Sequence, residues 1–217
     1  MPRQQGFLFI LWGLILAAAV LVGPRLANAT MVLPLNLEEM AGRADKIFIG
    51  ECESVVEGSD DNNFPATFVT YRVLEMIKGE ATPRISFKQY GVLQNKLDRF
   101  RESSATIEMT PYIYGQVTHA VGDRAVLFLR GDSELGFSGV VGMGQGKFLI
   151  RKDATGTPVA ENAFHNAFCY RRMKKGSPLA GLKKKMLRTE GTATGPFPCH
   201  DLVGTLKEIV GEQGARP

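Results

Sequence analysis

The chain has 217 residues, of which 44% are hydrophobic, and 26 basic against 22 acidic side chains give a net charge of +4. This length suffices for one sizeable hydrophobic core. The net charge is too small to indicate a nucleic acid as partner, and three histidines leave few candidates for a catalytic base.

The first 29 residues have the layout of a secretory signal peptide. Arg3 supplies a positive charge, residues 7–22 form an uncharged apolar run, and residues 27–29 form a small-x-small cleavage site. A membrane anchor is the alternative, but the run of 16 residues is shorter than the roughly 20 that a bilayer requires. We therefore expect cleavage after Ala29, export to the periplasm or the exterior, and a mature chain without a stable membrane span.

A short helix and a long strand are predicted next. Asn36 and Glu39 match a capping box, which predicts a helix over residues 37–44. Residues 45–58 alternate as a strand. Its core face would carry Phe48, Gly50, Cys52, Ser54 and Val56.

Several further short strands follow without an intervening long helix. They are predicted at residues 67–79, 84–91 and 122–131, as two strands within 136–153, and at 157–164 after a hairpin turn at 153–156. Residues 92–118 are expected to be irregular, with a short helix at 93–101 as an alternative. Because the strands lack crossover helices, residues 45–163 predict an antiparallel barrel or sandwich, and we favour a small barrel.

Two helices are predicted to close the chain. Ser177 and Pro178 would begin a helix over 179–188, and Asp201 would cap a second helix over 202–211. Each has an apolar face, which carries Leu179, Leu182 and Met186 in the first helix and Leu202, Leu206, Ile209 and Val210 in the second. We expect a barrel domain over residues 30–163 and a basic helical extension over 164–217 packed on it.

The order of four segments resembles a set of uncharacterised bacterial exported proteins. The segments are "LPLNLEEMAGRADKIFIGECESV", "TFVTYRVLEMIKG", "VGDRAVLFLRG" and "GMGQGKFLI". More distantly, residues 33–152 resemble the netrin-like barrels of the tissue inhibitors of metalloproteinases, which implies an OB-type fold. Those inhibitors begin with a cysteine that chelates the protease metal, whereas this mature chain would begin at Thr30 and its first cysteine is Cys52. The resemblance therefore implies the architecture and not the inhibitory mechanism.

The motifs that suggest catalysis have the wrong spacing. Gly142, Gly144 and Gly146 before Lys147 do not match a phosphate-binding loop, and Ser138 lacks the glycine two places later that a nucleophile elbow needs. We therefore predict no catalytic residue and no cofactor. The alternative is an extracytoplasmic hydrolase that would use the loop 92–118, with His119, Asp123 and Ser138 as residues whose clustering would support it.

Three cysteines have different expected roles. An oxidising compartment favours a disulfide between Cys169 and Cys199. Zinc bound by these cysteines with His165 and His200, or free thiols, are the alternatives. Cys52 is expected to act as a small apolar side chain in the core.

The predicted disulfide would bracket a run of basic residues without an acid. A solvated helix face is the common structure for such a run, but it could also contact the eight acids between residues 38 and 61, or bind an anionic envelope component or a protein. We expect an exported, non-catalytic binding protein. Its candidate partner-binding residues are Arg171, Arg172, Lys174, Lys175, Lys183, Lys184, Lys185 and Arg188.

Overall fold

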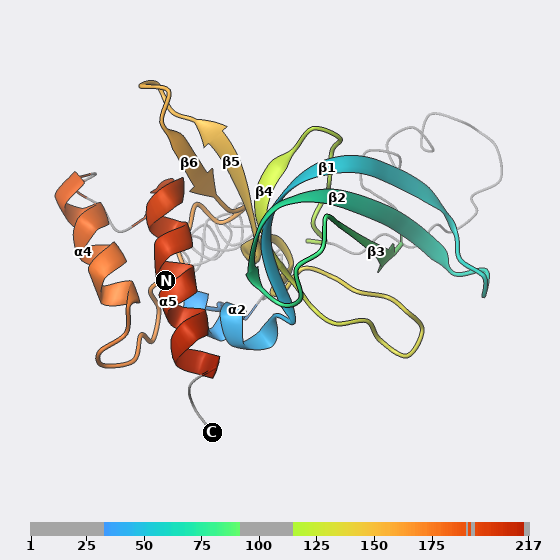
Figure 1. The fold of residues 1–217 in the computed structure, drawn as a ribbon, viewed down its shortest axis with the longest axis horizontal. Coiled ribbons are helices and arrows are strands. Elements are labelled where there is room, and N and C mark those ends of the chain that lie inside the picture. The colour runs from blue at the N-terminus through green and yellow to red at the C-terminus, as the bar shows by residue number, and fades with distance from the viewer. Residues whose placement is uncertain (1–32, 92–114, 190, 192–193, 215–217) are drawn as a thin grey trace, which may run out of the picture. The chain divides into compact units, whose positions relative to one another are not determined.

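The computed structural model describes residues 33–91, 115–189, 191 and 194–214 (Figure 1). The expected signal peptide at 1–29 and the alternative helix at 93–101 lie outside these residues. The helices are α2 (Leu37–Arg43), α4 (Leu179–Thr189) and α5 (Cys199–Gly214), with a 3-10 turn η1 (Met143–Gln145). The strands are β1 (Lys46–Ser59), β2 (Pro65–Lys78), β3 (Arg84–Tyr90), β4 (Arg124–Leu129), β5 (Lys147–Lys152), β6 (Pro158–Glu161) and β7 (Phe197–Pro198).

The strands form one seven-stranded sheet in the order β3-β2-β1-β4-β5-β6-β7. Every neighbouring pair in this order is antiparallel. This confirms the mainly β, antiparallel fold with two C-terminal helices that the sequence predicts. Strand β7 was not predicted, because its two residues form a strand only by pairing with β6.

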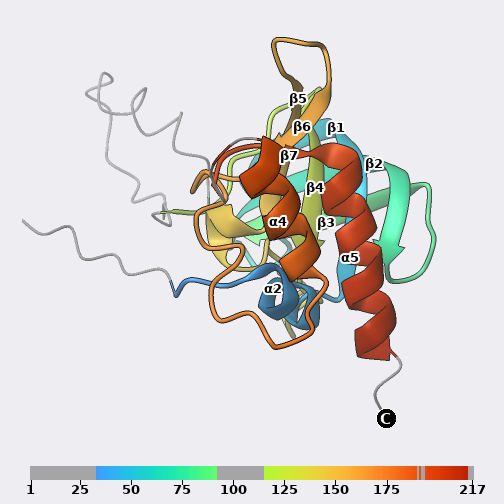
Figure 2. The ribbon, with the colours of Figure 1, turned by 90° about the vertical axis from the view of Figure 1, so that its left-hand side faces the viewer.

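Hydrophobic cores lie on both faces of the sheet. Alternate residues of β4 belong to different cores: Val126 and Phe128 to one, Leu127 and Leu129 to the other. The first core also contains side chains of α2, α4 and α5. Figure 2 shows these three helices in front of the sheet. The apolar faces predicted for the two C-terminal helices are confirmed, because their side chains lie in this core or pack against it.

Irregular pairing in β1 changes which side chains face the core. The register between β1 and β2 shifts between Cys52 and Ser54. A shift of one residue moves the following side chains to the opposite face of a strand. Phe48 and Cys52 lie in the core as predicted, but Val56 is 58% exposed and Val55 packs against the core instead. The predicted core face is therefore wrong beyond Cys52.

The glycine-rich segment before β5 is a tight turn and not a strand. The sequence predicted two strands within 136–153, and the structure has β5 together with two isolated bridges, at Phe137 and Val140. A Cβ atom on Gly146 would lie 2.4 Å from the carbonyl oxygen of Val141. The backbone can turn this closely only because Gly146 has no side chain.

The helix starts follow local capping chemistry with one exception. Asn36 and Glu39 form the predicted capping box of α2, and the Ser177 hydroxyl accepts a hydrogen bond of 3.1 Å from the amide of Leu179. Helix α5 begins at Cys199, so Asp201 lies in its first turn and is not the cap that we predicted. None of the described helices is long and apolar enough to span a membrane.

Candidate functional site

The basic residues predicted as a partner-binding surface lie before and along α4. Arg171, Arg172, Lys174 and Lys175 lie in the turns that precede this helix, and the other four lie on it. Helix α4 buries its apolar face in the helix-covered core. Seven of the eight basic residues are exposed, and Lys183 is partly buried. The eight residues of this set are called the basic run below.

Two members of the basic run form ion pairs. A guanidinium nitrogen of Arg172 lies 3.4 Å from a carboxylate oxygen of Glu39, and the Lys185 ammonium contacts the carboxylate of Asp201. Arg171 stacks on Phe168, with 5.9 Å between the guanidinium carbon and the ring centroid. Within residues 33–91, 115–189 and 194–214, the other six basic residues have no acidic partner.

Several of the eight acids between residues 38 and 61 form ion pairs with basic residues outside the basic run. Glu51 lies 3.0 Å from Arg72 of β2, and Glu53 lies 2.7 Å from Arg84 of β3. Asp60 lies 2.8 Å from Lys88 of β3. Glu39 contacts the basic run through its ion pair with Arg172. The basic run therefore contacts the acids between residues 38 and 61 at one end only, and most of its charge faces solvent.

The predicted disulfide is not formed in the structure. Cys52, Cys169 and Cys199 are free thiols. Cys169 is 1% exposed and packs in the helix-covered core, and the partly buried Cys199 is the first residue of α5. Burial raises the pKa of all three thiols, so each stays protonated and weakly nucleophilic. The segment after Cys169, which we expected a disulfide to hold, is instead anchored by the apolar packing of Cys169.

The residues of the alternative hydrolase are engaged separately. Ser138 donates a hydrogen bond of 2.6 Å to the carbonyl oxygen of Arg130. Asp123 lies 2.8 Å from the ammonium of Lys147. His119 lies 2.8 Å from the hydroxyl of Tyr71 through its Nδ1 atom. No hydrogen bond joins any two of His119, Asp123 and Ser138 within the described part of the chain.

His119 is part of the core and carries no charge at neutral pH. It is 4% exposed, and its ring makes edge contacts with Tyr71 and Phe87, with centroids 5.6 and 5.5 Å apart. Burial lowers the pKa of His119 to about 3, and the positive charge of Lys147 acts in the same direction. The Nε2 atom is buried and has no hydrogen-bond partner among the residues that the structure describes. His119 is therefore a buried, neutral part of the core.

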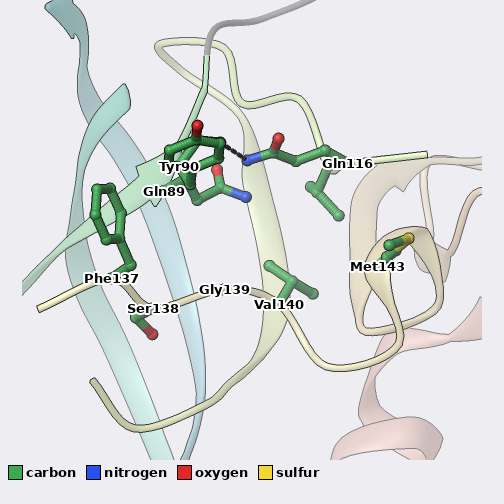
Figure 3. A pocket seen from close by; sticks show the side chains of 9 residues that line it. Gln89, Tyr90, Gln116, Phe137, Ser138, Gly139, Val140 and Met143 are labelled. Carbon is green, nitrogen blue, oxygen red and sulfur yellow. Dashed lines mark hydrogen bonds between the residues drawn. The ribbon is translucent and has the colours of Figure 1, made fainter. Parts of the chain in front are cut away.

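A small pocket lies beside the end of β3 and was not predicted from the sequence. Its volume is about 200 Å³. Figure 3 shows its wall, in which the amides of Gln89 and Gln116 lie near Tyr90. The lining consists of Gln89, Tyr90, Gln116, Val117, Phe137, Ser138, Gly139, Val140 and Met143. No member of this lining is charged, so the pocket differs in chemistry from the basic run.

Three aromatic rings from separate parts of the chain meet at one side of the pocket. Phe64 follows β1, Tyr90 ends β3, and Phe137 belongs to the loop after β4. Their centroids lie 5.6 to 6.4 Å apart. The Lys88 ammonium lies 4.2 Å from the centroid of Phe137. The sequence signal for this cluster is an aromatic residue beside each turn, but it does not say which turns meet.

Neither a relative of this chain nor a metal-ligand cluster identifies its function. No protein-family model matches the chain, and no curated protein matches it. Among the described residues, no group of three or more histidine, cysteine, aspartate or glutamate side chains could hold a metal ion. The function is therefore inferred from the residues and their geometry.

Proposed function

We propose that this protein is an exported binding protein without catalytic machinery, and that the basic run contacts an anionic component of the cell envelope. The observation that carries this proposal is the six basic side chains of the run that have no acidic partner among the described residues. Like charges that lie close together destabilise a surface unless they are solvated or neutralised. An anionic partner would neutralise them.

Salt and substitution together test this proposal. Replacing Lys174, Lys175 and Lys184 with Gln removes three exposed charges that have no described ion pair. We expect the variant to lose most of its association with a sedimented envelope fraction and to keep its melting temperature. Association of the unchanged protein should fall steeply with added salt, since exposed charges are screened beyond about 8–10 Å at physiological ionic strength.

A matched control separates the basic run from net charge. Replacing the exposed Arg130, Arg151 and Lys152 with Gln makes the same change in charge outside the run. This control should retain association. Equal losses in both variants, or association that salt does not affect, would contradict the proposal. Association that depends on the run but is lost after protease treatment of the envelope fraction would identify a protein as the anionic partner.

An OB-type barrel is proposed as the architecture that carries this surface. Phe137 forms a parallel bridge with Lys88 of β3, and Val140 forms an antiparallel bridge with Leu129 of β4. The amide of Ser138 donates a hydrogen bond of 2.9 Å to the carbonyl oxygen of Lys88. Residues 137–140 thus lie between β3 and β4, where a fifth strand would close β1 to β4 into a barrel. These two bridges are what supports the proposed barrel and netrin-like relationship, although the described strands form an open sheet.

The hydrolase remains the alternative class, and it would use the loop 92–118, of which residues 92–114 lie outside the described residues. His119 has a low pKa that suits a permanently neutral core residue, and Asp123 is held by Lys147. A general base needs a pKa near the working pH.

Export, which the proposal requires, is tested by mass spectrometry of the extracytoplasmic protein. We expect Thr30 as its first residue, and a full-length, detergent-dependent product would contradict it.

A further inference from the structure

One buried side chain in the pocket has a polar atom without a partner. Gln89 is 3% exposed, and its side-chain oxygen makes no hydrogen bond to any described residue. A buried amide oxygen without a partner is costly, and leucine would fill the same space without that cost. The polar group is therefore explained if a ligand supplies the missing hydrogen bond.

The neighbouring side chains indicate the polarity that a ligand must have. Gln116 donates a hydrogen bond of 3.0 Å to the carbonyl oxygen of Tyr90, but its own amide oxygen is buried and has no partner in the described part of the chain. Each amide can accept and donate, so a matching ligand carries groups that do both. Hydroxyl groups have this property. None of the described residues that line the pocket is charged, which favours a neutral ligand.

The rest of the wall indicates the shape of the ligand. Phe137, Val140 and Met143 are apolar, and Figure 3 shows them apart from the two amides. A ligand that suits both parts has hydroxyl groups on its edge and an apolar C–H face. The volume of about 200 Å³ admits a single six-membered ring and excludes a drug-sized molecule.

We propose that the pocket beside β3 binds one neutral sugar ring. Hydroxyl groups of the ring would bond the amides of Gln89 and Gln116, and its C–H face would pack against Phe137 and Val140. The site is independent of the basic run, because the two share no residue. A loss of one activity therefore does not remove the other.

Nuclear magnetic resonance of the labelled full chain tests the proposal. Methyl glucopyranoside, methyl galactopyranoside and N-acetylglucosamine are titrated separately. We expect at least one of them to shift the side-chain amide signals of Gln89 and the methyl signal of Met143. A ligand of this size that binds a small open pocket has a dissociation constant of about millimolar.

Gln89→Leu separates a binding role from a packing role. The substitution should weaken sugar binding about two- to tenfold, the value of one net hydrogen bond. It should also leave the melting temperature unchanged or raise it, because it removes an unpaired buried oxygen. Gln213→Leu makes the same chemical change on α5, where the amide contacts the carbonyl oxygen of Glu38, and should not alter sugar binding.

Four outcomes would overturn the proposal. One is the absence of any shift with all three sugars at concentrations well above millimolar. Another is full sugar binding by Gln89→Leu. The third is an equal shift with a neutral blocked dipeptide, which would show that the pocket recognises amide groups and not sugar hydroxyls. A marked loss of stability in Gln89→Leu would show that the amide has a structural partner instead.

Discussion

The ammonium of Lys88 on β3 lies 2.8 Å from the Oδ2 atom of Asp60, which follows β1. Lys88 also donates a hydrogen bond of 2.9 Å to the carbonyl oxygen of Leu135 in the loop after β4. Asp60 itself accepts hydrogen bonds from the amides of Asn62 and Phe64. One lysine thus ties two loops to β3 beside the pocket, which fixes the positions of the aromatic rings there.

This ion pair predicts a pH-dependent contribution to stability. The hydrogen bond from Lys88 holds the pKa of Asp60 below its usual value, and the amide of Phe64 acts in the same direction. The contribution is full above the unfolded pKa of about 3.9 and is lost as the pH falls through the lower folded pKa. Asp60→Asn should therefore lower the melting temperature at neutral pH, and the deficit should shrink below about pH 4.

The matched control for this prediction is the neighbouring Asp61. Its side chain is exposed and has no ion pair among the described residues. Asp61→Asn should leave the melting temperature nearly unchanged over the same pH range. A deficit in Asp60→Asn that does not change with pH would show that the charge of Asp60 is unimportant.

The burial of His119 predicts that acid lowers the stability of the fold at a higher pH than the Asp60 ion pair does. Its folded pKa is about 3 because of burial, whereas an unfolded histidine titrates near about 6.5. The unfolded chain therefore binds the proton first, and the free energy of unfolding should fall below about pH 6.5 by up to about 1.4 kcal/mol per pH unit. Urea titrations of the protein and of His119→Asn, between about pH 7 and about pH 4, measure this slope.

The histidine variant should lose this slope even if its stability is lower throughout. His119→Asn removes the titrating group and leaves an acceptor for the Tyr71 hydroxyl. His165→Asn is the control, since the side chain of His165 is 81% exposed. The control should keep the slope. Parallel curves for the protein and His119→Asn would contradict a buried neutral histidine.

The free cysteines predict a specific pattern of labelling. Three thiols should be counted after denaturation without reductant. In the folded protein, the partly exposed Cys199 should react first, because Cys52 and Cys169 are 2% and 1% exposed. Cys199→Ser should remove the fast phase. A count of one thiol in the denatured protein would instead show that two cysteines had formed a disulfide.

Two glycines predict opposite effects of the same substitution. A Cβ atom on Gly146 would lie 2.4 Å from the carbonyl oxygen of Val141, whereas Gly204 in α5 has open space. Gly146→Ala should lower the free energy of unfolding by about 1–3 kcal/mol through overpacking. Gly204→Ala should raise it by up to about 1 kcal/mol through helix propensity. Urea unfolding of both variants checks the pair, and a neutral Gly146→Ala would contradict the tight turn.

The candidate sites differ in how their residues are spread along the chain. The basic run is nearly contiguous, so the order of amino acids is enough to identify it. The pocket was missed because its lining comes from β3, from residues before β4 and from residues after β4, which no spacing rule connects. Gln89 in particular resembles an ordinary strand residue. Its burial without a partner for its oxygen follows only from the neighbours that folding places around it.

The sequence by itself determined the capping box of α2, the antiparallel strands and the apolar faces of α4 and α5. The signals for these features act within a few residues. Tertiary structure alone decided the bulge that packs Val55 against the core and exposes Val56. It also decided the burial of His119 and Cys169 and the pairing of Lys88 with Asp60. Each of these depends on a partner that is distant in sequence, and chain folding brings such partners together only when the whole sheet forms.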